Sequence, residues 1–552
     1  MCVGYAFATF MDALMSFEEE RLDEALVIMR DTEKKCAADI GWLKSVKSKM
    51  FGSKAINIAE KLENQIILAD IQVCVAIITF LQQEFSGYLK GGWVLRKAWK
   101  IYHQTYMEIV DIYKKKFGNF NVPEPTDFDW QDTAASSLSR SSSATTDGPS
   151  CEWSIPESNA PSPSHRQNGQ VDEIAPEDIA RLMGAVCFGY GALQLGMSLL
   201  PPSLLKVTNF FGFHGNRTAG ISNLMYARKG SDMRAPLAML ALLWYHTIVR
   251  PFYALDGTNI KAGLEAANLL MQESQSEYEQ SALFLFFHGR IYRLDSNIPK
   301  ALEAFQGAAD NSPQREMKLL ALHEVGWCHL VKLDFEEAQK VFLHLRQGSR
   351  WSRSFYAFLT IVCGASCNRK DILTITELKR LYQTSNTRAT QLDIFLQRRL
   401  RVFPDTTEAL QKTTVLYWKF FIYELIFLWN ALPSCSLEDI HNIIEDCNQT
   451  DSEPMPGLAM LIQGECYNIL QMYENAITSF RKCIATRSTS MPNDDLHISA
   501  FAEYGLGVLL LKSPESMDEG KSLLNNAANQ YKDSDFNNKL NVRIDMALQR
   551  VS

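Results

Sequence analysis

Few groupings of residues in this chain have the types and spacing that chemistry requires. Cys363 and Cys367 form a C-x3-C pair, but a structural zinc site needs four converging ligands, and no second pair follows at zinc spacing. His323, Cys328 and His329 are close in sequence, yet helical positions with this spacing do not all share one face. We therefore predict no metal site and interpret these side chains as buried thiols and packing residues.

Signatures of nucleotide binding and catalysis are equally incomplete. Gly189 and Gly191 begin a G-x-G, but Gln194 stands where the third glycine belongs, and the sequence has no Walker A string. The pentapeptide HEVGW that ends at Trp327 begins like a zinc-protease motif but lacks the second histidine, and no G-x-S-x-G elbow occurs. The sequence therefore predicts a protein that is not an enzyme and needs no cofactor.

The composition excludes other classes of protein. The 552 residues are 46% hydrophobic and 21% charged, which is typical of a folded chain and incompatible with global disorder. The net charge of −8 argues against a broad nucleic-acid-binding surface, because such a surface needs clustered Lys and Arg. The 12 cysteines are scattered, which favours a cytoplasmic location. No secretory signal is visible, and since the chain begins almost inside a helix, we expect a segment upstream of Met1 to be missing.

Residues 1–118 are predicted to form an N-terminal helical region with one degenerate repeat. Within it, residues 63–85 read as a strongly apolar helix, and Gly91 and Gly92 interrupt the pattern before a further helix. That helix should end where three lysines precede Gly118, because cations and a glycine are ordinary stop signals. Helices this apolar need a covering surface, so we expect the region to pack on the rest of the chain.

Residues 119–172 are predicted to be a disordered linker. From Gln131 to Gln170, 11 of the 40 residues are Ser and four are Pro. Such a segment cannot bury enough apolar surface to offset its ordering entropy. Serines such as Ser141 and Ser162 could be phosphorylated, or the segment could be a plain solubilising linker, which is the interpretation we favour.

An internal repeat begins after the linker. Residues 281–314 fit the 34-residue helix-turn-helix template of the tetratricopeptide repeat. The matches at template positions 8, 20, 24, 27 and 32 are Gly289, Ala301, Phe305, Ala308 and Pro313. Small residues allow the two helices of a unit to approach closely, and the large ones fill the space toward the next unit.

Further units follow the same template. We place the repeats at about 282–315, 319–352 and 457–490, with a degenerate unit at 498–532, and we read 353–450 as helical but off-template. Strand signals are weak throughout. The predicted fold for residues 173–552 is therefore an all-α helical solenoid of tetratricopeptide-like repeats with irregular helical insertions.

The chain resembles the tetratricopeptide repeat protein 39 family, which also contains a fungal inclusion-body clearance protein. The segments that carry the resemblance are KGGWVLRKAWKIY (90–102), residues 189–227 and 235–257, GSRWSRSFYAFLTIVC (348–363) and KLNVRIDMAL (539–548). The resemblance implies interaction roles without catalysis. Roles attached to family members include lipid homeostasis, aggregate clearance and cilium assembly.

The repeat class also implies which side chains line a concave partner groove. Template positions 2, 5, 9, 12 and 13 of each first helix place these residues there: Phe286, Arg290, Arg293, His323, Trp327, Leu461, Glu465 and Asn468. Arg290 and Arg293 could pair with an acidic peptide, or they could be solvated or bridge to neighbouring acids. The Lys and Asn that define chaperone-tail binders are absent from positions 5 and 9, so that subclass is not expected.

One stretch raises the question of a membrane. Residues 184–205 carry no charge, and their length alone would permit a spanning helix. Gln194 and several glycines lower the hydropathy of the stretch, and Pro201 and Pro202 break it, so we favour buried helices over a hairpin that docks on lipid. The predicted function is a cytoplasmic adaptor or scaffold that binds protein partners, not nucleic acid, in a repeat groove, and the alternative is a lipid-surface protein. The sequence predicts no oligomeric state.

Overall fold

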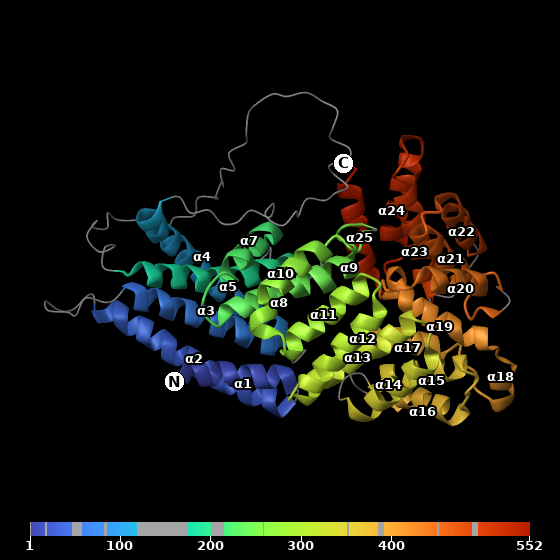
Figure 1. The fold of residues 1–552 in the computed structure, drawn as a ribbon, viewed down its shortest axis with the longest axis horizontal. Coiled ribbons are helices and arrows are strands. Elements are labelled where there is room, and N and C mark those ends of the chain that lie inside the picture. The colour runs from blue at the N-terminus through green and yellow to red at the C-terminus, as the bar shows by residue number, and fades with distance from the viewer. Residues whose placement is uncertain are drawn as a thin grey trace. The chain divides into compact units, whose positions relative to one another are not determined.

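The computed structural model describes residues 2–16, 19–46, 58–81, 85–118, 174–199, 215–257, 259–349, 353–384, 391–449, 452–487 and 495–551. Within these ranges the regular elements are helices, and we find no strand (Figure 1). Backbone contacts divide the chain into two compact units, Met1–Leu242 and Leu243–Ser552. The all-α fold class predicted from the sequence is confirmed.

The first unit is a succession of helices that pack on their neighbours in sequence. Its helices are α1 (Cys2–Ser16), α2 (Glu19–Val46), α3 (Ile58–Leu81), α4 (Phe85–Phe117), α5 (Pro176–Ser198), α7 (Arg217–Ala227) and the start of α8 (Arg234–Trp244). Ala13, Ala25 and Met29, the small and apolar residues of the predicted degenerate repeat, are buried in one cluster with Ile71 and Ile78 of α3. The repeat-like spacing therefore reflects real packing of α1 and α2 on α3.

The predicted interruption at Gly91 and Gly92 is wrong, because α4 runs through both glycines. A Cβ atom at Gly91 would lie 2.6 Å from the Phe80 ring, so the glycine serves close packing of α4 on α3 and not a turn. The predicted end of this helix is confirmed. Gly118 has a φ of +82°, and its N–H donates to the carbonyl of Lys114 at 2.9 Å.

The N-terminal helices share a core with α5. Tyr102 of α4 donates to the buried Asp70 of α3, and Asp70 also accepts from Arg234 of α8 at 2.8 Å. A Cβ atom at Gly189 of α5 would clash with the Tyr102 ring. The helices on either side of the predicted linker 119–172, α4 and α5, pack together and belong to one unit. The linker itself lies outside the described residues.

Two helices of this unit, α3 and α5, have the length and composition of a membrane span, with windows at Ile58–Phe80 and Pro176–Ser198. The unit buries 67% and 72% of these windows, respectively. Core helices of repeat arrays pass the same test, and the burial of α5 agrees with our preferred interpretation of 184–205. Pro201 and Pro202 lie outside the described residues.

The second unit contains the predicted repeats as helix pairs. They are α11 (Ala282–Leu294) with α12 (Ile298–Asn311), α13 (Arg315–Val331) with α14 (Phe335–Gly348), α21 (Leu458–Ile469) with α22 (Tyr473–Thr486), and α23 (Leu496–Leu510) with α24 (Met517–Gln530). Further helices are α9 (Arg250–Tyr253), α10 (Leu264–Tyr278), α15 (Arg353–Ser366), α16 (Ile372–Thr384), α17 (Gln391–Leu400), α18 (Thr407–Lys412), α19 (Val415–Leu428), α20 (Leu437–Cys447) and α25 (Asn537–Gln549). The π-helical turn Tyr245–Val249 leads into α9.

Each good repeat is held by one glycine against one phenylalanine. A Cβ atom at Gly289, Gly326 or Gly464 would lie 2.6 Å from the ring of Phe305, Phe342 or Phe480, respectively. In the degenerate unit the glycine that faces its own second helix is Gly507, against Leu524, whereas Gly505 faces Phe480 of the preceding unit. The template positions were therefore read correctly in the regular units and shifted by two residues in the last.

The turns inside the three regular helix pairs share one conformation, which the turns after α15 and α19 also adopt. The residue two positions after the first helix has a left-handed φ near +60° in the turns at Ser296, Leu333, Asn368, Asn430 and Gln471. The next N–H then donates to a carbonyl five residues earlier, as from Asp334 to His329 at 2.9 Å, which is the hydrogen bond of a Schellman turn. Because α15 and α19 end in the same way, the off-template segment 353–450 contains two repeat-like turns.

Candidate interaction site

The predicted groove residues of the first two repeats lie inside the protein. Phe286 is 5%, Arg290 8%, Arg293 8% and Trp327 2% exposed, so the prediction that they line an open groove is wrong. His323 is half-buried, and its ring meets the hydroxyl of Tyr356 at 3.2 Å. Burial lowers the pKa of His323 to about 4.

Arg290 and Arg293 are paired with an acid from the neighbouring repeat. Nη1 of Arg290 lies 3.0 Å and Nη1 of Arg293 2.5 Å from Oε2 of Glu324. Burial opposes ionisation of Glu324, but the two guanidiniums outweigh it and hold the pKa of this carboxyl at about 2. Of the alternatives left open by the sequence, bridging to a neighbouring acid is the correct one for both arginines.

Trp327 belongs to an aromatic stack. Its ring lies 5.5 Å from that of Trp429, with an interplanar angle of 28°. Trp429 in turn stacks on Phe355 at 5.7 Å and meets the edge of Phe536 at 5.4 Å. Trp327 of α13 is therefore covered by the ring of Trp429, which directly follows α19 and is itself flanked by Phe355 and Phe536.

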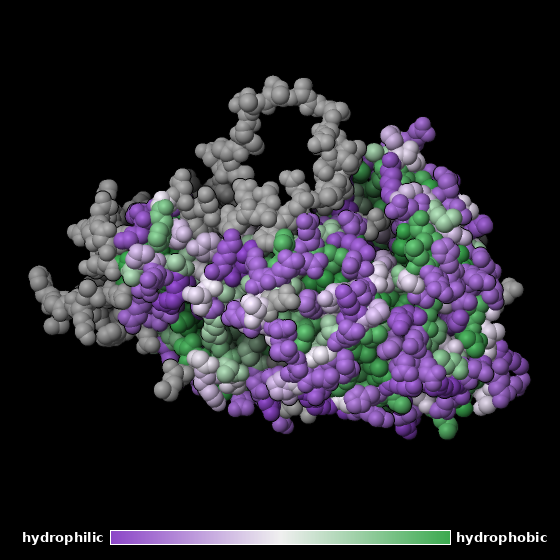
Figure 2. Space-filling model, in the orientation of Figure 1, coloured by the Kyte–Doolittle hydropathy of each residue, from purple (hydrophilic) through white to green (hydrophobic). Residues whose placement is uncertain are grey.

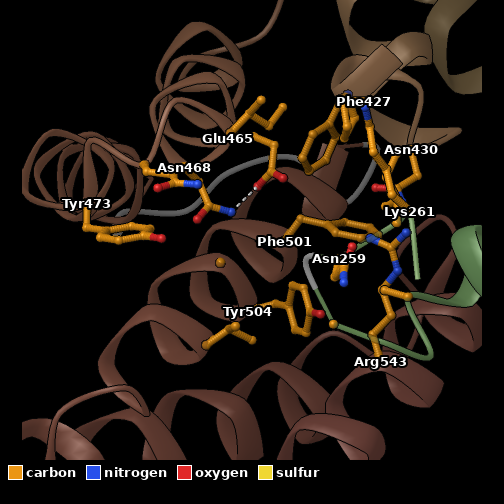
Figure 3. A pocket seen from close by; sticks show the side chains of 18 residues that line it. Asn259, Lys261, Phe427, Asn430, Glu465, Asn468, Tyr473, Phe501, Tyr504 and Arg543 are labelled. Carbon is orange, nitrogen blue, oxygen red and sulfur yellow. Dashed lines mark hydrogen bonds between the residues drawn. The ribbon is translucent and has the colours of Figure 1, made fainter. Parts of the chain in front are cut away.

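The third repeat divides the predicted residues between core and surface. Leu461 is fully buried, but Glu465 and Asn468 line a cavity of about 290 Å³ (Figure 3). Its other walls come from the segment between α9 and α10, the ends of α19 and α21, and α23 and α25. The polar side chains that join Glu465 and Asn468 are Asn259, Lys261, Asn430, Gln471, Tyr473, Tyr504 and Arg543.

The electrostatics of this cavity centre on Glu465. Burial raises the pKa of the Glu465 carboxyl to about 7, although the charge of Arg543 and a hydrogen bond from Asn468 pull it down. The Asn468 amide donates to Oε2 of Glu465 at 3.5 Å. The cavity thus offers one carboxyl that titrates near neutral pH, two cations and several amides, which are groups that bind a ligand by charge and hydrogen bonds.

One of the two cations of the cavity, Arg543, comes from α25, which sequence reasoning did not connect with the site. Three bases on this helix or its cap donate to backbone carbonyls: Lys539 to Leu428, Arg543 to Phe252 at 3.0 Å, and Arg550 to Leu255. Cations are favourable at helix C-termini, and Leu428 and Phe252 lie at the ends of α19 and α9. The segment KLNVR (539–543) contains the signal, since Lys539 and Arg543 are four residues apart and share a helix face.

Metal and thiol chemistry find no support among the residues that the structure describes. We find no group of three His, Cys, Asp or Glu side chains there that could hold a metal ion. Cys363 is buried, and burial raises its pKa far above the usual range; burial also raises the pKa of Cys328 to about 12. Both thiols are therefore poor ligands and poor nucleophiles near neutral pH.

The fold and the repeat turns define a helical repeat protein of the tetratricopeptide type, a class that mediates protein interactions through its concave surfaces. A family model described as Iml2/Tetratricopeptide repeat protein 39 matches residues 1–470. The chain belongs to this family, as the resemblance of its sequence indicated.

Proposed function

We propose that this protein is a non-enzymatic scaffold that binds protein partners in the cavity between α21, α23 and α25. The observation that carries the proposal is the convergence of Glu465 and Asn468 of the third repeat with Tyr504, Lys261 and Arg543 around one cavity. Tyr and Arg are enriched among the residues that dominate binding at protein interfaces. Of these residues, all but Lys261 lie on helices. Because helices already fix their positions, binding a partner costs little conformational entropy.

The second unit has a largely polar surface on one face, which favours a partner that is itself polar. On the face shown in Figure 2, hydrophilic residues predominate over the helices of the second unit, and hydrophobic residues are scattered between them. An interface there would rely on the cavity for specificity and on charge complementarity around it.

The proposed location is the cytoplasm. Eight cysteines of the described segments are buried outside any disulfide, as expected for a reducing compartment. Among the processes implied for the family, we propose cilium assembly as the setting in which to look for partners first.

The test fills the cavity. Asn468→Trp places an indole among the lining residues, and Gln306→Trp adds the same group to the exposed face of α12 as a control. Both variants should keep the helical circular dichroism of the wild type. In proximity proteomics in cells, we expect a defined set of partners to disappear with Asn468→Trp and to persist with Gln306→Trp. A partner list that is the same for all three proteins would refute the proposal.

A lipid-surface role in lipid homeostasis or aggregate clearance is the second candidate, favoured by the composition of α3 and α5. We rank it lower because both helices are largely buried in the first unit and would have to leave it to enter a bilayer. Flotation of the purified protein with liposomes or lipid droplets tests this candidate, and recovery only in the bottom fraction would remove it.

A further inference from the structure

Arg543 differs from the other strongly buried arginines of the second unit. Five other arginines of the unit are similarly buried, at 1–8% exposure, and each forms an ion pair with an acid. The pairs are Arg250–Asp256 at 2.6 Å, Arg290–Glu324 at 3.0 Å, Arg293–Glu324 at 2.5 Å, Arg399–Glu424 at 3.0 Å and Arg487–Asp495 at 2.7 Å. Arg543 is 6% exposed, yet no carboxylate of the described segments lies within ion-pair distance of it.

The hydrogen bonding of Arg543 is also incomplete. Nη2 donates to the carbonyl of Phe252 at 3.0 Å, and Nε is buried without a hydrogen-bond partner among the described residues. The carbonyls at the C-terminus of a helix carry roughly half a negative charge, and α9 is only four residues long. The full charge of the guanidinium is therefore only partly balanced, which is costly for a buried cation.

The guanidinium lies at the cavity and has a second cation close by. In Figure 3, Arg543 extends from α25 toward the segment that carries Asn259 and Lys261, and Glu465 and Asn468 occupy the opposite side. Lys261 is 47% exposed, and its ammonium is 3.4 Å from Asp295, so it marks the open side of the cavity. Arg543 and Lys261 thus define a positive end, and Glu465 lies at the other.

The amides of the cavity suit a peptide. Asn259 and Asn468 line the wall, and Asn430 lines it as well while its amide donates to the carbonyl of Pro251 at 2.8 Å. Side-chain amides both donate and accept, as the peptide group requires. The cavity volume of about 290 Å³ is at the lower limit of pockets for small molecules, about 300 Å³, and suits one or two side chains better than a lipid or a nucleotide.

We propose that the cavity binds a carboxylate of an extended partner peptide, from an Asp or Glu side chain or from the chain terminus, against Arg543 and Lys261. This inference rests on the proposed function and specifies the chemistry of the partner. A planar guanidinium binds carboxylates with directed, charge-assisted hydrogen bonds. The negative charge of the bound carboxylate would balance the positive charge of Arg543, for which the described residues provide no ion pair.

The experiment selects peptides on the full-length protein from a random library with free C-termini. One selected peptide is then synthesised in three forms: unchanged, with its acidic side chains replaced by amides, and with a C-terminal amide. Fluorescence anisotropy gives the affinity of each form. We expect at least one neutralised form to bind about tenfold or more weaker, and the form that does so identifies the source of the carboxylate.

The protein variants locate the contact. Lys261→Glu changes an exposed residue and should fold normally, and it should weaken the unchanged peptide about tenfold or more. Lys318→Glu, on the exposed side of α13, is the matched control and should leave the affinity unchanged. Arg543→Gln should also weaken peptide binding. If Arg543→Gln fails to fold, the affinity of Lys261→Glu still tests whether the peptide carboxylate binds at this end of the cavity.

The outcomes separate this inference from the proposed function. If Asn468→Trp abolishes peptide binding but the neutralised peptides bind as well as the acidic one, the cavity binds peptides without recognising a carboxylate. The inference then fails and the scaffold proposal stands. If no peptide is selected, or Asn468→Trp has no effect, both fail. Binding to phosphatidylserine vesicles that is lost in Lys261→Glu, without peptide binding, would replace the peptide by a lipid headgroup and overturn the inference.

Discussion

Nη1 of Arg290 lies 3.2 and 3.0 Å from the two carboxylate oxygens of Glu324. The residues belong to the first helices of adjacent repeats, α11 and α13, so the ion pair ties the repeats together from the side where a partner was predicted to bind. Nη2 of Arg290 also donates to the carbonyl of Thr247 at 3.0 Å. The chain itself thus supplies the acid for these arginines, which is one of the alternatives that the sequence left open.

Glu324→Gln should destabilise the second unit strongly. The substitution removes the negative charge that Arg290 and Arg293 share, and breaking a buried ion pair from one side costs about 3–5 kcal/mol. Urea denaturation followed by circular dichroism measures the loss. Glu337→Gln is the control, since its carboxylate and the Lys340 ammonium that it pairs with are 46% and 57% exposed, and an exposed ion pair contributes little to stability. Equal midpoints for the two variants would contradict the structural role of Glu324.

Gly326→Ala and Gly307→Ala should shift stability in opposite directions. A Cβ atom at Gly326 would lie 2.6 Å from the ring of Phe342, which is fully buried and cannot move away, so we expect a loss of about 1–3 kcal/mol. At Gly307 the nearest atom would be 3.7 Å away, and alanine should add about 0.5–1 kcal/mol. Thermal melting of both variants checks the pair, and a stabilised Gly326→Ala protein would show that the repeat interface is looser than described.

Gln471→Gly should stabilise the turn between α21 and α22. Gln471 has a φ of +59° and is exposed, so glycine removes the steric penalty of the left-handed conformation, about 1 kcal/mol, without removing a buried side chain. Gln471→Ala keeps the Cβ atom and should gain little. The comparison of these two variants in denaturant titrations isolates the backbone effect, and a gain shared by both would assign it to the lost side chain instead.

Glu465→Gln should change how stability depends on pH. The pKa of Glu465 is about 7 in the folded protein against an ordinary value of 4.5, so between these values the folded state binds more protons than the unfolded state. Stability therefore falls as the pH rises through this window. The glutamine variant should escape this fall and be more stable than the wild type above pH ~7, by at most about 3 kcal/mol.

The groups around Glu465 do not change between these two proteins. Burial by its neighbours is the largest influence on its pKa, followed by Arg543 of α25, the Asn468 hydrogen bond, and Lys512 at the end of α23. Tyr504 of α23 and Lys261 also line the cavity. Unfolding of both proteins at pH 5 and pH 8 gives the comparison, and a stability difference that is the same at both values would place Glu465 in contact with water.

The two fragments of a chain that is cut between α4 and α5 should remain bound to each other. Cleavage at a protease site inserted within residues 131–170 leaves the packing of α4 on α5 and the 2.8 Å ion pair between Arg234 and Asp70 intact. We expect the two fragments to co-elute in gel filtration under native conditions. Separate elution would show that the first 118 residues fold independently of the rest of the chain.

The sequence by itself determined the helical class and the repeats. The contacts of Gly289 with Phe305 and of Gly464 with Phe480 can be predicted from their spacing in the sequence. The two helices of a unit are neighbours in the chain, and one small residue that faces one large residue is enough to set their contact. Glu465 and Asn468 were found for the same reason, since the template places them on the inner face of α21.

Only the tertiary structure decided which part of that inner face is open. Trp327 and Trp429 are about a hundred residues apart in sequence, and Arg543 reaches Phe252 across almost three hundred. The repeat template contains no information on such distant pairs, so Arg290 and Trp327 could not be recognised as buried. The position of Arg543 in the cavity likewise depends on where α25 packs, and this is set by long-range contacts with the ends of α9 and α19.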